Sequence, residues 1–121
     1  TFQFKAVPDK IEEAKFLYVN TESKSFNLNL AEITHIEADG SYSKIFKLNS
    51  DLIFSSKNLG EYEKNLPDSF FRAHKSVLVN LHLVKEIDAK NGILLMQNDI
   101  EVAVSRRKKP LLNQALKELL G

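Results

Sequence analysis

The chain has 121 residues, no cysteine and a formal net charge of +1, with 43% hydrophobic and 27% charged residues. This composition predicts one soluble globular domain with its own core, and it excludes disulfide frameworks and thiolate metal sites. No apolar run reaches the roughly 20 residues that a membrane-spanning helix needs, and the mixed charges of the first residues lead us to expect no signal peptide.

Residues 1–15 have no clear periodicity and contain Pro8, which predicts a linker or N-terminal extension ahead of a domain at 16–121. Because the chain begins with Thr1 rather than methionine, we interpret it as a fragment of a longer protein. From Phe16 onward, short alternating segments separated by turn-prone residues are typical of half-buried strands. The predicted strands are 16–20, 26–30, 33–38, 42–48 and 52–55.

A short helix is predicted next. Asn58 can cap its first turn together with Glu61 three residues later, and Pro67 cannot continue it. Its apolar side chains fall on one face, at Leu59, Tyr62 and Leu66.

The stretch Phe70–Asn80 changes abruptly from a basic polar loop to an apolar strand. Arg72, His74 and Lys75 lie in the polar part, and no acidic residue occurs between 70 and 85. Alternation from Val77 predicts a strand that continues to residue 87. A rigid strand would then begin with a cationic tip, which suits contact with an anion. Within this tip His74 can orient the loop by bonding to the backbone, and Asn80 is expected to satisfy a neighbouring loop.

The C-terminal part continues the same pattern. Asn91 and Gly92 predict a tight turn, with strands at 93–96 and 100–104 on either side of the next connection. The last element is a predicted amphipathic helix with an apolar face of Leu111, Leu112, Ala115, Leu116, Leu119 and Leu120. Together these segments predict a mostly antiparallel β domain with two short accessory helices.

A run of four cations, Arg106, Arg107, Lys108 and Lys109, precedes this helix. If Ser105 is the N-cap or Pro110 is the first helical residue, the cations lie at the positive end of the helix dipole. Each cation there costs about 0.3 to 1 kcal/mol, and an anion bound at that end would relieve the repulsion. A solvated basic turn is the equally simple alternative.

Neither a metal site nor an enzyme is predicted. His35, His74 and His82 are separated in sequence and lack the paired spacing of metal ligands. The glycines are isolated, so no phosphate-binding glycine loop exists, and no nucleophile motif is present. We therefore expect no cofactor, no metal and no catalytic residue.

Four motifs in order resemble the LytTR family of DNA-binding domains. They are I-T-H-I-E-A at 33–38 followed by Tyr42, Leu66-Pro67, the segment 70–80, and V-S-R-R at 104–107. The resemblance extends from about residue 16 to residue 116. Most members of this family are output modules of bacterial two-component response regulators, and they have an elongated multi-sheet antiparallel β fold.

The resemblance implies three DNA-contacting loops. Arg107 takes the place of a base-contacting residue, with Arg106, Lys108 and Lys109 beside it. Lys75 is in the second loop, where Arg72 and His74 would serve phosphates or support the turn. The first loop holds Tyr42, Ser43 and Lys44, although the ring of Tyr42 could equally pack against Phe46.

These observations predict a sequence-specific duplex-DNA binder, the cytoplasmic output domain of a bacterial transcription regulator. Its loops would enter successive major grooves of repeated half-sites, with a homodimer on the DNA and a receiver domain N-terminal to this chain. The alternative is a protein-protein interaction module of a signalling protein, since the net charge of +1 is low for a nucleic-acid binder.

Overall fold

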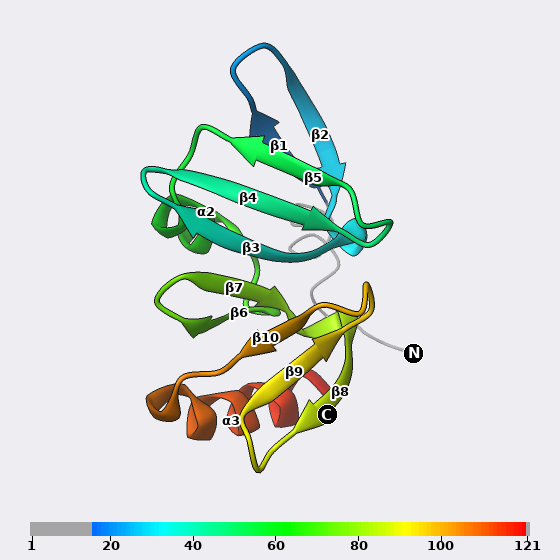
Figure 1. The fold of residues 1–121 in the computed structure, drawn as a ribbon, viewed down its shortest axis with the longest axis vertical. Coiled ribbons are helices and arrows are strands. Elements are labelled where there is room, and N and C mark those ends of the chain that lie inside the picture. The colour runs from blue at the N-terminus through cyan, green and yellow to red at the C-terminus, as the bar shows by residue number, and fades with distance from the viewer. Residues whose placement is uncertain (1–15, 121) are drawn as a thin grey trace.

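The computed structural model describes residues 16–120, which form three antiparallel sheets and two α-helices arranged along the long axis of the molecule (Figure 1). The first sheet pairs β1 (Phe16–Asn20) with β2 (Ser25–Asn29). The central sheet has the strand order β5-β4-β3-β7-β6, and the third has the order β10-β9-β8. The mostly β, elongated multi-sheet fold is as predicted, whereas the predicted linker at 1–15 lies outside the described residues.

The bounds of the other elements agree with the predicted pattern in most places. The central sheet contains β3 (Ile33–Asp39), β4 (Tyr42–Lys47), β5 (Leu52–Ser55), β6 (Phe70–His74) and β7 (Val77–Asn80). The third sheet contains β8 (Val84–Asp88), β9 (Ile93–Met96) and β10 (Glu101–Ala103). The helices are α2 (Leu59–Asn65) and α3 (Lys109–Leu120), and the short 3-10 turns are η1 (Leu30–Glu32), η2 (Leu81–Leu83) and η3 (Arg106–Lys108).

The central sheet separates two hydrophobic cores because successive strand residues point to opposite faces. Ile36, Ile45 and Leu78 face one core, which α2 and the β1–β2 sheet complete. Val77 and Val79 face the other core, against β9, β10 and α3. The β6–β7 hairpin is therefore buried on both faces, since Phe70 and Leu78 also belong to the first core and Ala73 belongs to the second.

The capped helix α2 is confirmed. The Asn58 side chain accepts from the Glu61 amide at 2.9 Å, and the Glu61 carboxylate accepts from the Asn58 amide at 3.5 Å. Leu59 and Tyr62 are buried against the central sheet, where the Tyr62 hydroxyl bonds to Ser55 Oγ. This reciprocal cap satisfies two backbone donors that the helix leaves free.

The predicted continuous strand from Val77 to residue 87 is wrong. β7 ends at Asn80, η2 follows, and β8 belongs to a different sheet. The buried Asn80 side chain accepts from the His82 amide at 3.0 Å and donates to the carbonyls of Leu30 and Ile33 at 3.2 and 2.9 Å. These bonds start a 3-10 turn that moves the chain from one sheet to the next. Asn80 thus serves a neighbouring loop, as predicted.

The predicted polar loop before Val77 is also wrong, because Phe70–His74 forms strand β6. It pairs antiparallel with β7, and only Lys75 and Ser76 remain as the turn. Phe70 and Ala73 are buried, which holds this basic segment in the sheet despite its polar residues. The cations therefore lie on a paired hairpin rather than on an unpaired loop.

The final helix is confirmed, but its apolar face is narrower than predicted. Leu112 is buried, and Ala115, Leu116 and Leu119 pack on the same core. Leu111 is 50% exposed. A residue adjacent in a helix is rotated by about 100°, so Leu111 falls outside the face that Leu112 defines.

His35 lies inside the central sheet with no exposed surface, stacked on Phe46 at a centroid distance of 4.2 Å. Thr34 Oγ1 donates its single proton to the Phe46 carbonyl at 3.1 Å. In its 3.0 Å contact with His35 Nδ1 the same oxygen must therefore accept, which assigns the ring proton to Nδ1. Nε2 then has no hydrogen-bond partner among residues 16–120. Burial lowers the pKa of His35 from 6.5 to about 4, so the ring is neutral at pH 7.

We expect the free energy of unfolding to fall by about 3 kcal/mol as the pH falls from about 6.5 to about 4. In this pH range His35 binds a proton in the unfolded chain but not in the folded protein. The contribution is complete at neutral pH, above the unfolded pKa. His35→Phe keeps an aromatic ring that can stack on Phe46 and removes the titratable imidazole. Urea unfolding across this pH window should show a flatter pH profile for the variant, and parallel profiles would contradict the assignment.

Candidate nucleic-acid interface

Three connections lie along one edge of the molecule, one after another on its long axis (Figure 1). They are the β3–β4 turn, the β6–β7 turn at Lys75 and Ser76, and η3 between β10 and α3. Gly40 in the first turn has φ 62°, a conformation that glycine adopts without steric cost. The fold therefore brings the three predicted loops to the same edge.

Backbone hydrogen bonds join the three connections. The Ala38 amide donates to the Ser76 carbonyl at 2.8 Å, which links the first turn to the second. The Ser105 amide donates to the Ala73 carbonyl at 2.9 Å, which links η3 to the second. The β6–β7 register shifts between Arg72 and His74, so Ala73 is the extra residue of a bulge. Because these are main-chain bonds, the spacing of the loops depends on the sheet rather than on their side chains.

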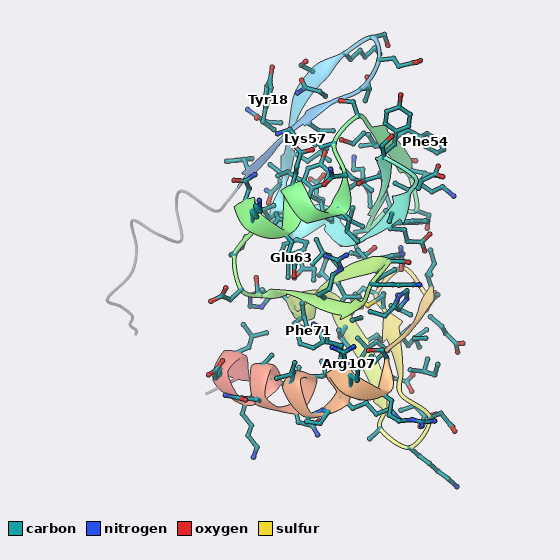
Figure 2. All side chains as sticks on the ribbon, turned by 90° about the vertical axis from the view of Figure 1, so that its left-hand side faces the viewer. Tyr18, Phe54, Lys57, Glu63, Phe71 and Arg107 are labelled. Carbon is teal, nitrogen blue, oxygen red and sulfur yellow. The ribbon has the colours of Figure 1, made fainter. Side chains whose placement is uncertain are left out.

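The second and third loops share a hollow of about 550 Å³. Figure 2 labels Arg107 on the η3 side and Glu63 on α2, on the other side of the β6–β7 hairpin. The hollow is lined by Glu63, Arg72, His74, Lys75, Ser105, Arg107 and Lys108. Arg and Lys thus dominate its surface, and Glu63 is the one carboxylate among the described residues that line it.

Several cations of the second and third loops are free to contact a ligand. Lys75, Arg106 and Arg107 are exposed, and Lys108 is partly buried. Within the described part of the chain, no hydrogen bond or ion pair occupies their side-chain nitrogens. Such cations attract phosphate, and an exposed arginine can also bond to a guanine edge.

Arg72 and His74 are held inward instead. Arg72 Nη1 pairs with Glu63 Oε1 at 2.5 Å, and its other nitrogens donate to carbonyls of the turn. His74 Nδ1 accepts from the Ser76 amide at 3.1 Å, which agrees with the predicted orienting role. Both side chains shape the turn that presents Lys75.

The three predicted residues of the first loop differ in their exposure to solvent. Tyr42 is 57% exposed, Lys44 is partly buried, and Ser43 has no exposed surface. Ser43 Oγ donates to the Lys57 carbonyl at 2.7 Å inside the sheet. Phe46 stacks on His35, while Tyr42 faces solvent at the turn.

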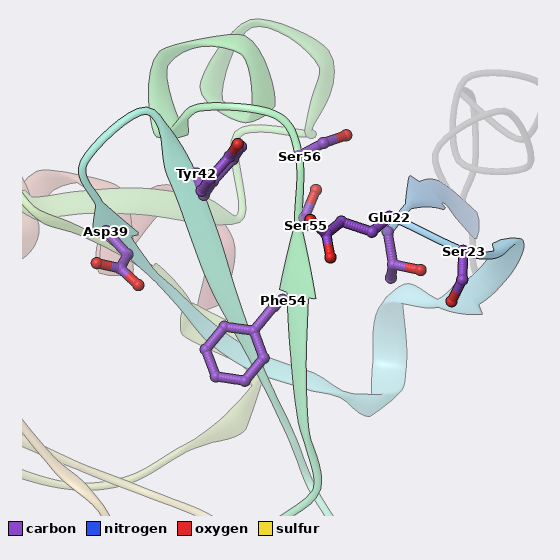
Figure 3. Close-up of a pocket in the computed structure, with 8 residues that line it drawn as sticks. Glu22, Ser23, Asp39, Tyr42, Phe54, Ser55 and Ser56 are labelled. Atoms are coloured by element: carbon purple, nitrogen blue, oxygen red, sulfur yellow. The ribbon is translucent and has the colours of Figure 1, made fainter.

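A second hollow, of about 380 Å³, lies beside Tyr42 (Figure 3). It has carboxylates and hydroxyls but no cation among the described residues that line it, which are Thr21, Glu22, Ser23, Asp39, Tyr42, Phe54, Ser55 and Ser56. The Ser56 amide donates to the Asn20 carbonyl at 2.9 Å and so holds the β1–β2 sheet against β5. The surroundings of the first loop are therefore acidic, unlike those of the other two.

The four cations of the basic run before α3 also differ in their surroundings. Ser105 makes no side-chain cap bond, and α3 has no acidic residue in its first turn, so the cations remain near the positive helix end. Lys109 packs over Gly92, where an added Cβ would lie 2.5 Å from Lys109 Cε. Bonds from Asn91 lower the pKa of Asp88, and the charge of Lys109 lowers it further. Lys109 therefore serves the β8–β9 turn.

Sequence reasoning did not single out Glu63 as part of this site. Glu63 is an exposed acid on α2 like its neighbours, and only the packing of α2 beside the β6–β7 hairpin brings it to the hollow. Nothing local in the sequence signals this position. In contrast, the free cations next to turns could be found from the charge pattern.

Residues 16–120 contain neither a metal-binding cluster nor a membrane-spanning helix. No three His, Asp or Glu side chains come together in a way that could hold a metal ion. No helix there combines the length and apolar character needed to span a bilayer.

The comparison with family models decides the family. The model of the LytTr DNA-binding domain matches residues 23–117, which is most of the chain. The chain belongs to the LytTR family of DNA-binding domains. This confirms the resemblance that the four motifs carried, and the matched region includes all three connections on the shared edge.

A solved LytTR structure has the same fold. It is described as the LytTr DNA-binding domain of a methyl-accepting/DNA response regulator from Bacillus cereus. The TM-score is 0.71 at 24% sequence identity, and the match covers 84% of this chain and 96% of that one. A search of the curated proteins found none that matches this chain.

Ser43→Ala should lower the free energy of unfolding by about 1 to 2 kcal/mol, because it leaves the partly buried Lys57 carbonyl without the Ser43 hydroxyl donor. Ser41→Ala, at an exposed position of the same LytTR turn, should change stability by less than about 0.5 kcal/mol. Urea unfolding at neutral pH measures both values. Equal stability of the two variants would show that the Ser43 hydroxyl contributes nothing.

Proposed function

We propose that this LytTR domain binds duplex DNA sequence-specifically as the output domain of a bacterial two-component transcription regulator. The observation that carries the proposal is the shared edge, where three connections are spaced by backbone bonds and two of them present free cations. Turns spaced along an elongated domain can enter successive major grooves, where base edges are distinguishable. Phosphate contacts would set the register on the duplex.

The environments of the side chains support a division of roles. Arg107 is exposed and unpaired among the described residues, so we propose that it reads a base, with Lys75 at the second turn. Arg106 and Lys108 would contact phosphates. In the first loop Tyr42 and Lys44 remain candidates, while Ser43, buried in the sheet, can act only through the backbone. Arg72, His74 and Lys109 would support the loops.

The proposed assembly pairs two domains on repeated half-sites. One domain would cover a half-site, and a homodimer would read repeats about one helical turn, or roughly 10 to 10.5 bp, apart. A receiver domain N-terminal to this chain would control pairing in the cytoplasm of a bacterium. The Bacillus cereus match, from a response regulator, supports this context.

A protein-interaction module is the second candidate. One face of the β4–β5 hairpin is not covered by the third sheet, and Tyr42, Leu52 and Phe54 are 57%, 41% and 56% exposed. Grouped exposed apolar side chains on a sheet favour a protein contact. The two surfaces share Tyr42, but Arg107 belongs only to the basic edge and Phe54 only to the apolar face, so substitutions at these two residues separate the functions.

The first test is selection from a randomised duplex library at near-physiological salt. A DNA-reading domain should enrich a short motif, especially one repeated a helical turn apart. A folded domain that enriches no motif would refute the proposal and favour the interaction module.

Arg107→Ala should weaken binding to the selected duplex by about 1 to 3 kcal/mol and relax one base position, because a bidentate contact is lost. Lys108→Ala should weaken selected and scrambled duplexes alike and reduce the salt slope by about 1. Fluorescence anisotropy on both duplexes across a salt series measures this. Equal losses for Arg107→Ala on the two duplexes would exclude its base-reading role.

A further inference from the structure

Glu63 occupies an electrostatically unfavourable position for a DNA-binding surface. Its side chain lines the same hollow as Lys75, Arg107 and Lys108, and it is 45% exposed. A carboxylate beside docked phosphates repels them, so on charge alone its removal should tighten DNA binding. The negative charge of Glu63 is compensated within the protein by an ion pair with Arg72.

Arg72 connects Glu63 to the tip of the β6–β7 hairpin. Nη1 pairs with Glu63 Oε1 at 2.5 Å, Nε donates to the His74 carbonyl at 3.1 Å, and Nη2 donates to the Lys75 carbonyl at 2.5 Å. All three guanidinium nitrogens are therefore used within the protein. The Arg72 side chain is 22% exposed, whereas Lys75 beside it belongs to the exposed residues.

The two carbonyls that Arg72 holds belong to the turn that carries Lys75. This turn follows a bulge at Ala73, whose carbonyl is in turn bonded to the Ser105 amide at 2.9 Å. A bulged turn has fewer ladder bonds than a regular hairpin, so its conformation depends more on side-chain bonds. The planar guanidinium suits this task because it fixes several acceptors at once.

We infer that Glu63 and Arg72 form a brace that holds the β6–β7 turn in its DNA-reading geometry. Arg72 is then a positioning residue and not a phosphate contact, and Glu63 increases affinity for the selected site despite its negative charge. This inference rests on the proposed function, since it assigns the brace to the same interface. It predicts an effect opposite in sign to the one expected from charge.

The test compares Glu63→Ala with Glu118→Ala, which removes an exposed acid near the far end of α3. We expect Glu63→Ala to weaken the selected duplex roughly threefold to tenfold, the size of one or two charge-assisted bonds at a partly exposed site. Glu118→Ala should leave affinity unchanged or slightly higher. Tighter binding by Glu63→Ala, as charge alone predicts, would overturn the brace.

Arg72→Lys separates positioning from phosphate contact. Lysine keeps the charge but cannot bond both carbonyls, so we expect a loss similar to that of Glu63→Ala, with an unchanged salt slope. Retained affinity for Arg72→Lys would show that the charge alone matters and would overturn the inference. A salt slope smaller by about 1 would do the same, because it would reveal a lost phosphate contact.

Hydrogen exchange in the free protein distinguishes failure of the brace from failure of the proposed function. The Ser76 amide bonds to His74 Nδ1 in the turn, and its exchange should be faster in Glu63→Ala but not in Glu118→Ala. Unchanged exchange would overturn the brace even if the wild-type domain selects a duplex. Faster exchange in a domain that selects no duplex would refute DNA reading while leaving the bracing of the turn established.

Discussion

The pairing of β3 with β7 is the interaction on which the rest of the structure depends. It joins the β3–β4 hairpin to the β6–β7 hairpin through the register His35↔Val79, Ile36↔Leu78 and Glu37↔Val77. Alternation along these strands sends Ile36 and Leu78 into one core, and Val77 and Val79 into the other. A slip of one residue would turn each set toward the opposite face of the sheet and mismatch both cores, so the register also fixes where the two turns emerge.

Charge distribution, rather than total charge, gives this LytTR domain its basic edge. The net charge is only +1, because acids elsewhere offset the cations of the second and third loops. The cations gather near the positive end of α3, with no acid in its first turn. Such an arrangement costs stability in the free protein and favours an anionic ligand. The acidic hollow beside Tyr42 makes the first loop electrostatically different, so any contact that it makes with DNA depends less on phosphate attraction.

Residues of the same type have different roles because their surroundings differ. Arg107 has no partner among the described residues, whereas Arg72 uses every guanidinium nitrogen within its own turn. Lys75 extends into the basic hollow, while Lys109 packs over Gly92. The two histidines also differ in their surroundings. His35 is buried inside the sheet and stays neutral, whereas His74 lies next to the turn and accepts a backbone hydrogen bond. A basic residue near a turn is thus a candidate contact only when the fold leaves its donors unoccupied.

The sequence by itself determined most of the strands, the capped helix α2, the turns and the two cationic segments, because alternation, capping and turn chemistry are local. It also carried the motifs of the LytTR family. Only the tertiary structure decided that Phe70–His74 is a strand, that Asn80 breaks the next one, and that Glu63 reaches the basic hollow. These outcomes depend on partners distant in sequence, such as the Leu30 and Ile33 carbonyls for Asn80, and local patterns contain no information about them.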